Sequence, residues 1–208
     1  MIARLEFASC YAYSPHGKSE LSDQSRQLCY RIKAGDPEAI RLAAERVREF
    51  AESGRFPGFF GPEVTLVAVP GRAPLAPGAS SRTRQICDAL LRCGLAREVV
   101  PLLDRIEPVL KSAYAAPVER PTVEQHYGTM TVTQTLLAPV RALLVDDVVT
   151  RGATLLGAAW RFGEAFPRCE LRGFAMVRTE SFDEVMRVRD PCVGSIEIAR
   201  SGKAVRRP

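Results

Sequence analysis

Apolar positions recur with a helical period through most of the first sixty residues. The run over 21–34 places Leu21, Leu28 and Ile32 on one helical face and is followed by Gly35, which predicts a helix. A second helix is predicted over 37–53, where Asp36 provides the N-cap and an apolar stripe ends just before a glycine. A short strand is predicted at 2–7. We therefore expect residues 1–60 to form a helical accessory region.

Beyond a turn-rich connector, short apolar runs alternate with helical stretches. This alternation is typical of βαβ units and a parallel sheet. Strands are expected at 64–69, 98–103, 141–145 and 171–177, and helices at 81–93 and 153–166. Residues 61–208 are thus predicted to form an α/β core, an open parallel sheet flanked by helices.

Two further stretches complete this prediction. An edge strand is expected from Ser195, followed by a basic, frayed tail that includes Lys203, Arg206 and Arg207. Residues 104–129 have no clear period, several prolines and many charges. Long irregular stretches in compact domains are usually binding loops, lids or disordered segments. We expect a surface loop or hairpin there.

Composition fits an ordinary globular protein of 208 residues, 46% of them hydrophobic and 25% charged. No apolar stretch is long enough to cross a bilayer, and Arg4 and Glu6 interrupt any signal-like pattern. We therefore expect a cytoplasmic protein without membrane contact. The six cysteines form no Cys-x-x-Cys pair and the two histidines lie far apart, so a structural zinc site is not expected.

The net charge of +5 comes from an arginine-rich set of basic residues, 25 Arg against 4 Lys. Arginine binds phosphate oxygens through a planar, bidentate fork, which favours phosphate-bearing ligands. A genome rich in arginine codons would give the same composition with most side chains simply solvated. A modest positive charge agrees with anionic small molecules and with nucleic acid alike, so it does not choose between them.

The run ALLVDDVVTRGATL at 142–155 carries the strongest functional pattern. An apolar strand leads into Asp146 and Asp147, and a short loop then opens a helix. Ligands of open α/β sheets bind beyond the carboxyl ends of the strands, where the unpaired N–H groups and dipole of a helix N-terminus favour phosphate. Gly152 lets the backbone approach such an anion, and nearby threonine hydroxyls add hydrogen bonds.

Asp146 and Asp147 are adjacent carboxylates at the end of an apolar strand. If the two residues were only a helix cap or a surface pair, nothing would offset the repulsion between their negative charges. Adjacent carboxylates make chemical sense where their partners are sugar hydroxyls or the water shell of a magnesium ion. The pair is therefore a candidate sugar and Mg²⁺ site.

This run resembles the phosphoribosyl-diphosphate-binding signature of type I phosphoribosyltransferases, an apolar strand followed by two acidic residues, a threonine, a glycine and a closing threonine. The resemblance implies that Asp146 and Asp147 are catalytic, holding the ribose 2′ and 3′ hydroxyls directly and Mg²⁺ indirectly, through the ribose or water. It also implies that the 5-phosphate is wrapped by Val149, Thr150, Arg151, Gly152, Ala153 and Thr154. Arg151 departs from the family pattern, in which many members have a small hydroxyl residue, so its role stays open.

The order of elements in that family implies further ligand contacts. Pro70, Gly71 and Arg72 follow the first core strand, in the position of a loop that contacts pyrophosphate, although Pro-Gly is also an ordinary turn. Downstream, a flexible loop of the family folds over the diphosphate with basic side chains. Arg105 and Lys111 lie in the corresponding irregular stretch.

Within the family the nearest likeness is to the competence-related, ComF-like phosphoribosyltransferases, over roughly residues 64–178. The zinc ribbon that commonly begins that subfamily is not in this sequence. In the family a hood outside the core sheet contacts the acceptor base. Residues 1–60, the region around Phe182, or both are expected to form it. Arg82 and Arg84, at the start of a predicted helix, are further candidates for ligand contact.

Two hypotheses from different functional classes follow. The resemblance implies a Mg²⁺-dependent enzyme, expected to be a homodimer, that transfers phosphoribose from phosphoribosyl diphosphate to an unidentified base or amine. The alternative is a non-catalytic module that senses phosphoribosyl diphosphate or a nucleotide, as a protein partner in a toxin–antitoxin, phage-defence or DNA-uptake system. The acidic pair and the threonines fit both. A third, weaker hypothesis is nucleic-acid binding through the arginine-rich surface.

Overall fold

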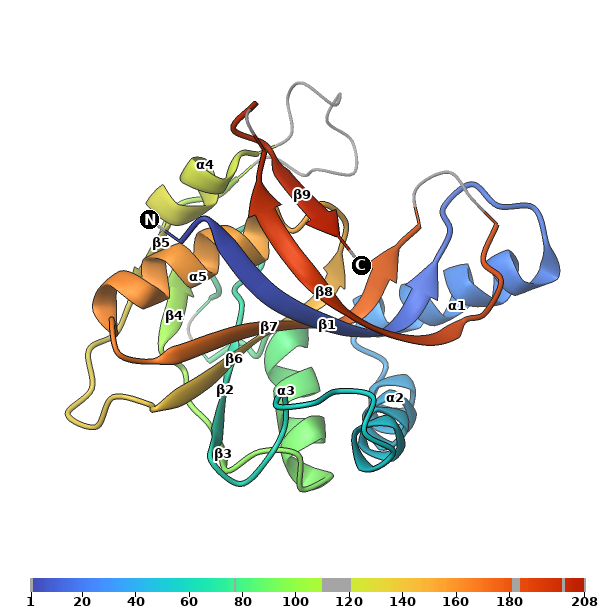
Figure 1. Cartoon of the computed structure of the whole chain (residues 1–208), viewed down its shortest axis with the longest axis horizontal. Coiled ribbons are helices and arrows are strands. Elements are labelled where there is room, and N and C mark those ends of the chain that lie inside the picture. Colours follow the sequence, from blue (N-terminus) through green and yellow to red (C-terminus); the bar gives the residue numbers. More distant parts are fainter. Residues whose placement is uncertain (1, 77, 110–120, 181–183, 200, 208) are drawn as a thin grey trace.

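The strands form a seven-stranded sheet in the order β3-β2-β6-β7-β1-β8-β9 (Figure 1). The computed structural model describes residues 2–76, 78–109, 121–180, 184–199 and 201–207. The strands of the sheet are β1 Arg4–Tyr13, β2 Val64–Ala68, β3 Glu98–Val99, β6 Arg141–Val149, β7 Glu170–Thr179, β8 Arg189–Ile198 and β9 Ala204–Arg207. A separate antiparallel pair consists of β4 (Leu103–Arg105) and β5 (Met130–Val132).

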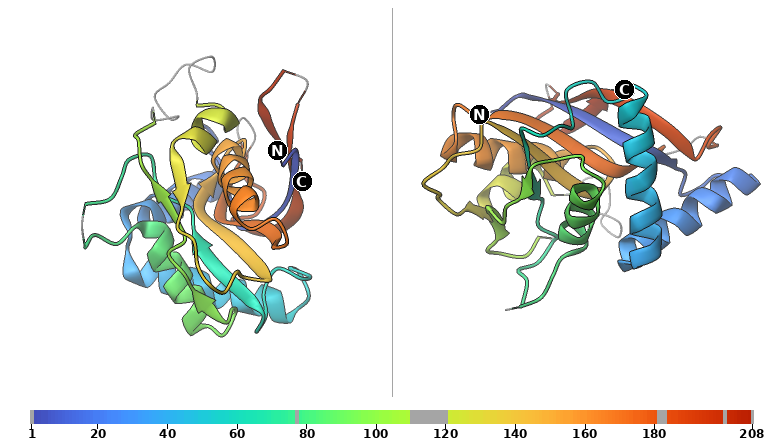
Figure 2. Two further views of the ribbon diagram at one scale, coloured as in Figure 1. Left: turned by 90° about the vertical axis from the view of Figure 1, so that its left-hand side faces the viewer. Right: turned by 90° about the horizontal axis from the view of Figure 1, so that it is seen from below.

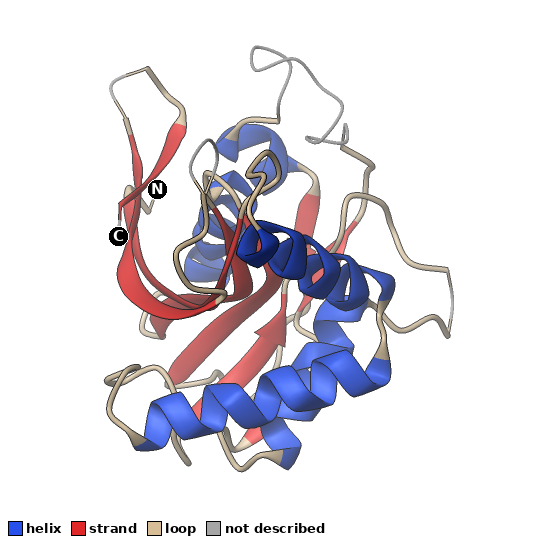
Figure 3. Cartoon of the chain, turned by 90° about the vertical axis from the view of Figure 1, so that its right-hand side faces the viewer, coloured by secondary structure: helices blue, strands red, loops and turns tan. Residues whose placement is uncertain are grey.

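Helices cover both faces of this twisted sheet (Figures 2 and 3). They are α1 Glu20–Ala34, α2 Pro37–Glu52, α3 Arg82–Arg92, α4 Val123–Gly128 and α5 Ala153–Ala165. On one face α1, α2 and α3 share a core with Leu143 and Val145 of β6, whereas α4 and α5 share the other core with Leu144. Alternate side chains of β6 are thus buried on both faces, as in other parallel sheets covered by helices.

Five neighbouring strands run parallel, from β3 through β2, β6 and β7 to β1. β8 and β9 continue the sheet as antiparallel strands. The predicted α/β class, with an open, mostly parallel sheet flanked by helices, is confirmed. Because parallel strands end at the same edge, the loops after β2, β6 and β7 lie near one another.

β1 is longer than the predicted strand at 2–7 and lies inside the sheet, between β7 and β8. Most of it is buried on both faces, and Ser9 and Cys10 are fully enclosed. A strand of this kind lacks the alternation that would mark its end in the sequence. The region 1–60 therefore contributes a strand to the core sheet, and α1 and α2 are the helical part of this region.

The prediction of a frayed C-terminal tail is wrong, because this segment forms β9 and pairs with β8. Arg206 is largely enclosed, and its Nη2 donates a 2.7 Å hydrogen bond to the carbonyl oxygen of Thr179 at the end of β7. The edge strand expected from Ser195 begins earlier, at Arg189. Burial of Arg206 depends on partners far away in the chain, which a count of charges does not reveal.

The irregular stretch at 104–129 is partly regular. β4 and β5 pair antiparallel, as the hairpin alternative predicted, and α4 lies between them. α4 begins with a capping box in which Thr122 and Gln125 exchange side-chain-to-backbone hydrogen bonds. It has six residues, too few to show a helical period. The strand predicted at 98–103 is divided between β3 and β4, which belong to different sheets.

Candidate functional site

The two predicted carboxylates lie at the carboxyl end of β6. The strand continues to Val149 instead of ending at Val145, so Asp146 and Asp147 belong to its last residues. Successive side chains of a strand point to opposite faces. Asp147 is thus on the face of Val145 and the α1–α3 core, and Asp146 is on the face covered by α4 and α5. The carboxylates lie on either side of the strand end.

The loop after β2 lies beside this strand end. The N–H of Val69 donates to the carbonyl oxygen of Val145 at 2.9 Å. In the predicted pyrophosphate loop that follows, Pro70 is buried, whereas Gly71 and Arg72 are exposed. The structure therefore brings this loop close to the two aspartates.

Asp147 is paired with an arginine from another element. Its Oδ2 lies 2.9 Å from Nε of Arg82, the first residue of α3, and its Oδ1 accepts the N–H of Val148 at 2.8 Å. Nη1 of Arg82 also donates to the carbonyl oxygen of Lys33 at the end of α1, at 3.0 Å. Arg82 thus reaches the candidate site and connects it to α1 and α3.

The carboxyl of Asp146 lies in surroundings that oppose its ionisation. Its Oδ1 accepts the N–H of Asp147 at 2.8 Å. Burial, and then the negative charge of Asp147, raise the pKa of the Asp146 carboxyl well above its ordinary value, and Arg82 offsets only part of this. Excess negative charge here favours a cation or hydroxyl donors. The oxygens of this pair therefore fit a sugar diol or the water shell of Mg²⁺.

The loop after β6 contains a glycine that no other residue could easily replace. Gly152 has φ +91° and is the N-cap of α5. A Cβ at this position would lie 2.6 Å from the side chain of Ile196 on β8. Among the described residues, no protein acceptor receives a hydrogen bond from the backbone N–H groups of Arg151, Gly152, Ala153 and Thr154. These groups lie at the positive end of α5 and can receive an anion.

The threonine hydroxyls of this loop contact neighbouring elements. Thr150 Oγ1 lies 3.2 Å from Thr179 Oγ1 at the end of β7. Thr154 Oγ1 lies 3.3 Å from Nε2 of His126 on α4. A hydroxyl offers one donor and two acceptor positions, so each keeps capacity for a ligand.

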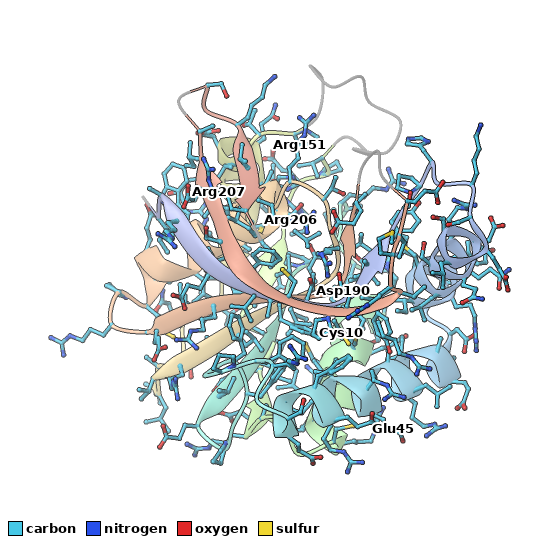
Figure 4. All side chains as sticks on the ribbon, turned by 45° about the vertical axis from the view of Figure 1, so that its right-hand side comes forward. Cys10, Glu45, Arg151, Asp190, Arg206 and Arg207 are labelled. Carbon is cyan, nitrogen blue, oxygen red and sulfur yellow. The ribbon has the colours of Figure 1, made fainter. Side chains whose placement is uncertain are left out.

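The other predicted loop residues differ in exposure. The side chains of Val149 and Ala153 pack in the core shared with α4 and α5. The side chain of Arg151 is exposed (Figure 4). Val149 and Ala153 can therefore offer a ligand only their backbone, whereas Arg151 can also offer its guanidinium.

Arg105 lies inside the protein. Its buried guanidinium donates from Nε to the carbonyl oxygen of Gly71 at 2.9 Å, and its other nitrogens contact Thr129 and His126. Burial lowers the pKa of Arg105 to about 10, and the charge of Asp146 opposes this effect. Arg105 thus holds the loop after β2 in place with a guanidinium that is buried.

Three other residues were candidates for the site from the sequence. Lys111 and Phe182 lie outside the described residues. Arg84 forms an ion pair with Asp88, one turn further along α3, at 2.9 Å. The charge of Arg84 is therefore balanced within its own helix.

His126 is a site residue whose partners the sequence does not indicate. Its imidazole is buried on α4, with Nδ1 3.4 Å from Nη2 of Arg105 and Nε2 3.3 Å from the Thr154 hydroxyl. Burial, with a smaller contribution from Arg105, lowers its pKa to about 4, so His126 is neutral at pH 7. The neighbouring Tyr127 stacks on Trp160, with ring centroids 4.2 Å apart. His126 thus links α4 to the start of α5.

A second buried arginine lies at the end of β7. Arg178 pairs with Glu180 at 2.7 Å and with Asp190 on β8. Arg206 of β9 lies 3.9 Å from the same Glu180. These ion pairs connect β7, β8 and β9, and so hold the C-terminal hairpin beside the loop after β6.

The described part of the chain lacks two features, a cluster of metal-binding side chains and a membrane-spanning helix. No group of three or more His, Cys, Asp or Glu side chains there could hold a metal ion. No helix of that part has both the length and the apolar character needed to cross a membrane. A metal held near Asp146 and Asp147 would therefore need oxygens from a ligand or from water as well.

Comparison with known proteins gives likenesses of structure. The chain matches no protein-family model and no curated protein. A hypoxanthine phosphoribosyltransferase from Staphylococcus aureus is similar at a TM-score of 0.40 and 9% identity, over 71% of this chain and 76% of that one. Adenine phosphoribosyltransferase from Leishmania tarentolae is similar at 0.37 and 16% identity, over 73% and 78%. Likeness at this level assigns neither family nor activity, so the function is argued from the site residues.

Proposed function

We propose that this chain binds phosphoribosyl diphosphate with Mg²⁺ and transfers its phosphoribosyl group to a nitrogen of an unidentified base or amine. One observation carries the proposal. The backbone N–H groups of 151–154, which have no protein acceptor in the described part of the chain, follow almost directly on the carboxylates of Asp146 and Asp147. A site for an anion and a site for hydroxyls or a cation thus lie within one short segment, as a sugar phosphate requires.

The phosphate monoester would lie at the start of α5. Its oxygens would accept hydrogen bonds from the N–H groups of 151–154, and the helix dipole would favour its charge. The hydroxyls of Thr150 and Thr154 would add donors. Asp146 and Asp147 would accept hydrogen bonds from the ribose hydroxyls, which fixes the sugar next to its phosphate.

In the reaction the acceptor nitrogen forms a bond to C1 of the ribose while the bond from C1 to the pyrophosphate oxygen breaks. The nitrogen then loses a proton to solvent or to the leaving group. Glycosyl transfer of this kind has an oxocarbenium-like transition state, and the charges of Asp146 and Asp147 would stabilise it. When bound, Mg²⁺ would neutralise charge on the pyrophosphate, and the two aspartates would hold it through water or the ribose.

Pyrophosphate release tests the proposal. The wild-type protein is incubated with phosphoribosyl diphosphate, Mg²⁺ and a panel of bases and amines. Release is expected, and the Asp146→Asn/Asp147→Asn variant should lower it by about a hundredfold or more. Glu63→Gln, a carboxylate change just before β2 at the opposite edge of the sheet, is the matched control and should keep the full rate. Failure of the wild-type protein to bind phosphoribosyl diphosphate in a calorimeter contradicts the proposal.

A non-catalytic sensor of phosphoribosyl diphosphate or a nucleotide is the second candidate. The position of Arg105 favours it. This arginine was expected to contact the diphosphate, but it is buried and hydrogen-bonds to Gly71 and His126 instead. Such a module would respond to its ligand as a partner in a toxin–antitoxin, phage-defence or DNA-uptake system. Mg²⁺-dependent binding without pyrophosphate release for any acceptor would select this candidate.

The acceptor contact is proposed to lie on α1, α2 and the connection between β7 and β8, which together would form the hood. Glu184 of this connection accepts hydrogen bonds from Ser19 and Ser22 at the start of α1, at 2.6 and 2.7 Å. The two parts of the proposed hood therefore contact each other directly.

A further inference from the structure

We propose that Arg105 and His126 form a hydrogen-bond relay that fixes the Thr154 hydroxyl as a donor toward the anion at the start of α5. The inference rests on the proposed function for the identity of that anion, a phosphate monoester. Arg105 and His126 are positioning residues in this scheme, because they act on the ligand through Thr154.

The direction of the relay follows from which atoms can donate. A guanidinium carries only donors, so Nη2 of Arg105 must donate to Nδ1 of His126, 3.4 Å away. A neutral imidazole has one donor and one acceptor, so His126 carries its proton on Nε2. Nε2 lies 3.3 Å from Oγ1 of Thr154. In this contact the imidazole therefore donates and the hydroxyl accepts.

Thr154 is left with its own hydroxyl proton to donate. It is the second residue of α5, and among the described residues no protein acceptor binds its backbone N–H. One residue thus offers an O–H and an N–H at the start of the helix. An anion can accept from both, whereas a cation can accept from neither.

The surroundings of His126 keep the imidazole neutral and close to α5. The ring is buried, and its pKa is lowered to about 4 by burial and then by Arg105. α4 approaches α5 closely at Gly157, where a Cβ would lie 2.7 Å from Cβ of His126. The absence of a side chain at Gly157 therefore allows the ring to reach Thr154.

Arg105 also joins the relay to the loop after β2. Its Nε donates to the carbonyl oxygen of Gly71 at 2.9 Å, and the hydroxyl of Thr129 holds the same guanidinium. One buried cation thus contacts the loop after β2 directly and the start of α5 through His126. The relay fixes the two predicted ligand loops relative to each other.

The tautomer of His126 can be measured without any ligand. In ¹⁵N-labelled full-length protein at pH 7, long-range proton–nitrogen correlation spectra should show His126 protonated on Nε2 and unprotonated on Nδ1. The chain has two histidines, so loss of one set of signals in His126→Gln assigns the ring. A His126 ring that is protonated on Nδ1, or charged, overturns the relay.

Calorimetric titration with ribose 5-phosphate and with inorganic phosphate tests the donor role. Thr154→Val and His126→Phe should each weaken binding about ten- to hundredfold, the effect of one hydrogen bond to a charged group. The double variant should bind no more weakly than Thr154→Val, because both changes remove the same donor. His126→Gln, whose amide can replace the Nε2 donor, should keep most of the affinity. Tyr127→Phe, which removes a hydroxyl bonded to Glu164, is the matched control and should bind as the wild type.

The outcomes separate this inference from the proposed function. Wild-type affinity in His126→Phe, or losses that add in the double variant, would show that the relay is wrong. Binding of inorganic phosphate that depends on His126 and Thr154, without binding of ribose 5-phosphate, supports the relay and contradicts the proposed function. If the wild type binds neither probe, both are overturned.

Discussion

The carboxyl of Asp146 lies where burial and the negative charge of Asp147 oppose its ionisation. Six positions later, Gly152 has a left-handed backbone conformation and lies against the side chain of Ile196. Unfavourable local features of this kind are retained where a site needs them, rather than where stability alone is selected. Each of the two residues therefore gives a prediction about stability.

Asp146→Asn is expected to stabilise the free protein at neutral pH. Because the folded-state pKa is raised, the carboxyl favours folding below its ordinary pKa, and this contribution is lost as the pH rises through the folded-state pKa. A neutral amide avoids the loss and should gain on the order of 1 kcal/mol at pH 7. The gain should vanish below about pH 4, where the aspartate is protonated in both states. Urea unfolding across this pH range measures it, and a less stable variant at pH 7 would contradict the inferred cause.

Gly152→Ala is expected to lower the free energy of unfolding by about 2–4 kcal/mol, because left-handed strain adds to the clash with Ile196. Gly94→Ala provides the matched control, since Gly94 has φ +72° and open space where a Cβ would lie. That control should cost only the backbone part, about 1–2 kcal/mol. Equal losses in the two variants, measured by chemical denaturation, would rule out the contact with Ile196.

At the scale of elements, the sequence predicts those whose pattern is long and begins or ends at a recognisable residue. Asp36 is an example, since this predicted N-cap accepts the N–H groups of Glu38 and Ala39 at the start of α2. β9 has four residues and α4 has six, so neither shows a period. Their existence depends on contacts with other elements, such as Arg206 with Thr179.

A carboxylate of the connection between β7 and β8 accepts several hydrogen bonds from the start of α1 and the residues just before it. Glu184 accepts hydrogen bonds from the N–H groups of Lys18 and Ser19 at 2.6 and 3.1 Å, and from the hydroxyls of Ser19 and Ser22. These bonds, with that of the Ser19 side chain the largest, lower the pKa of Glu184 to about 2. An ionised Glu184 therefore stabilises the contact between this connection and α1.

Glu184→Gln is expected to lower the urea midpoint at pH 7. Because the folded-state pKa is lowered, the stability from the carboxylate is present above the ordinary value of 4.5 and is lost as the pH falls toward about 2. The difference between wild type and variant should shrink over that range. Glu20→Gln, in the first turn of α1, is the control for a change of charge alone. A difference that stays constant with pH would contradict the role given to Glu184.

For the whole molecule, the α/β class is predictable because apolar runs alternate with helices, whereas the position of β1 is not. A strand does not reveal its neighbours, and β1 joins β7 and β8 from the other end of the sequence. The same distinction between local and long-range information applies to the site. Asp146 and the loop to Thr154 are local in sequence, while Arg82 and His126 reach it only through packing of separate helices.

Ligand binding is expected to stabilise the whole fold. At a phosphoribosyl diphosphate concentration about a hundred times Kd, the gain is about 2.7 kcal/mol, which corresponds to a rise in Tm of about 5–10 °C for a chain of this size. Scanning calorimetry with Mg²⁺ and this ligand measures the rise, and Mg²⁺ alone should give none. The same rise in Asp146→Asn/Asp147→Asn would indicate binding at another place.

The contact between Gly152 and Ile196 has a consequence for synthesis on the ribosome. The threonines and the glycine of the loop leave the exit tunnel well before β8, which supplies Ile196 and pairs with β1. A nascent chain that has emerged only through α5 holds the loop residues without the strand that covers them. In the proposed function the anion site is therefore completed late in translation, when β8 pairs with β1 after the earlier strands of the sheet have already left the tunnel.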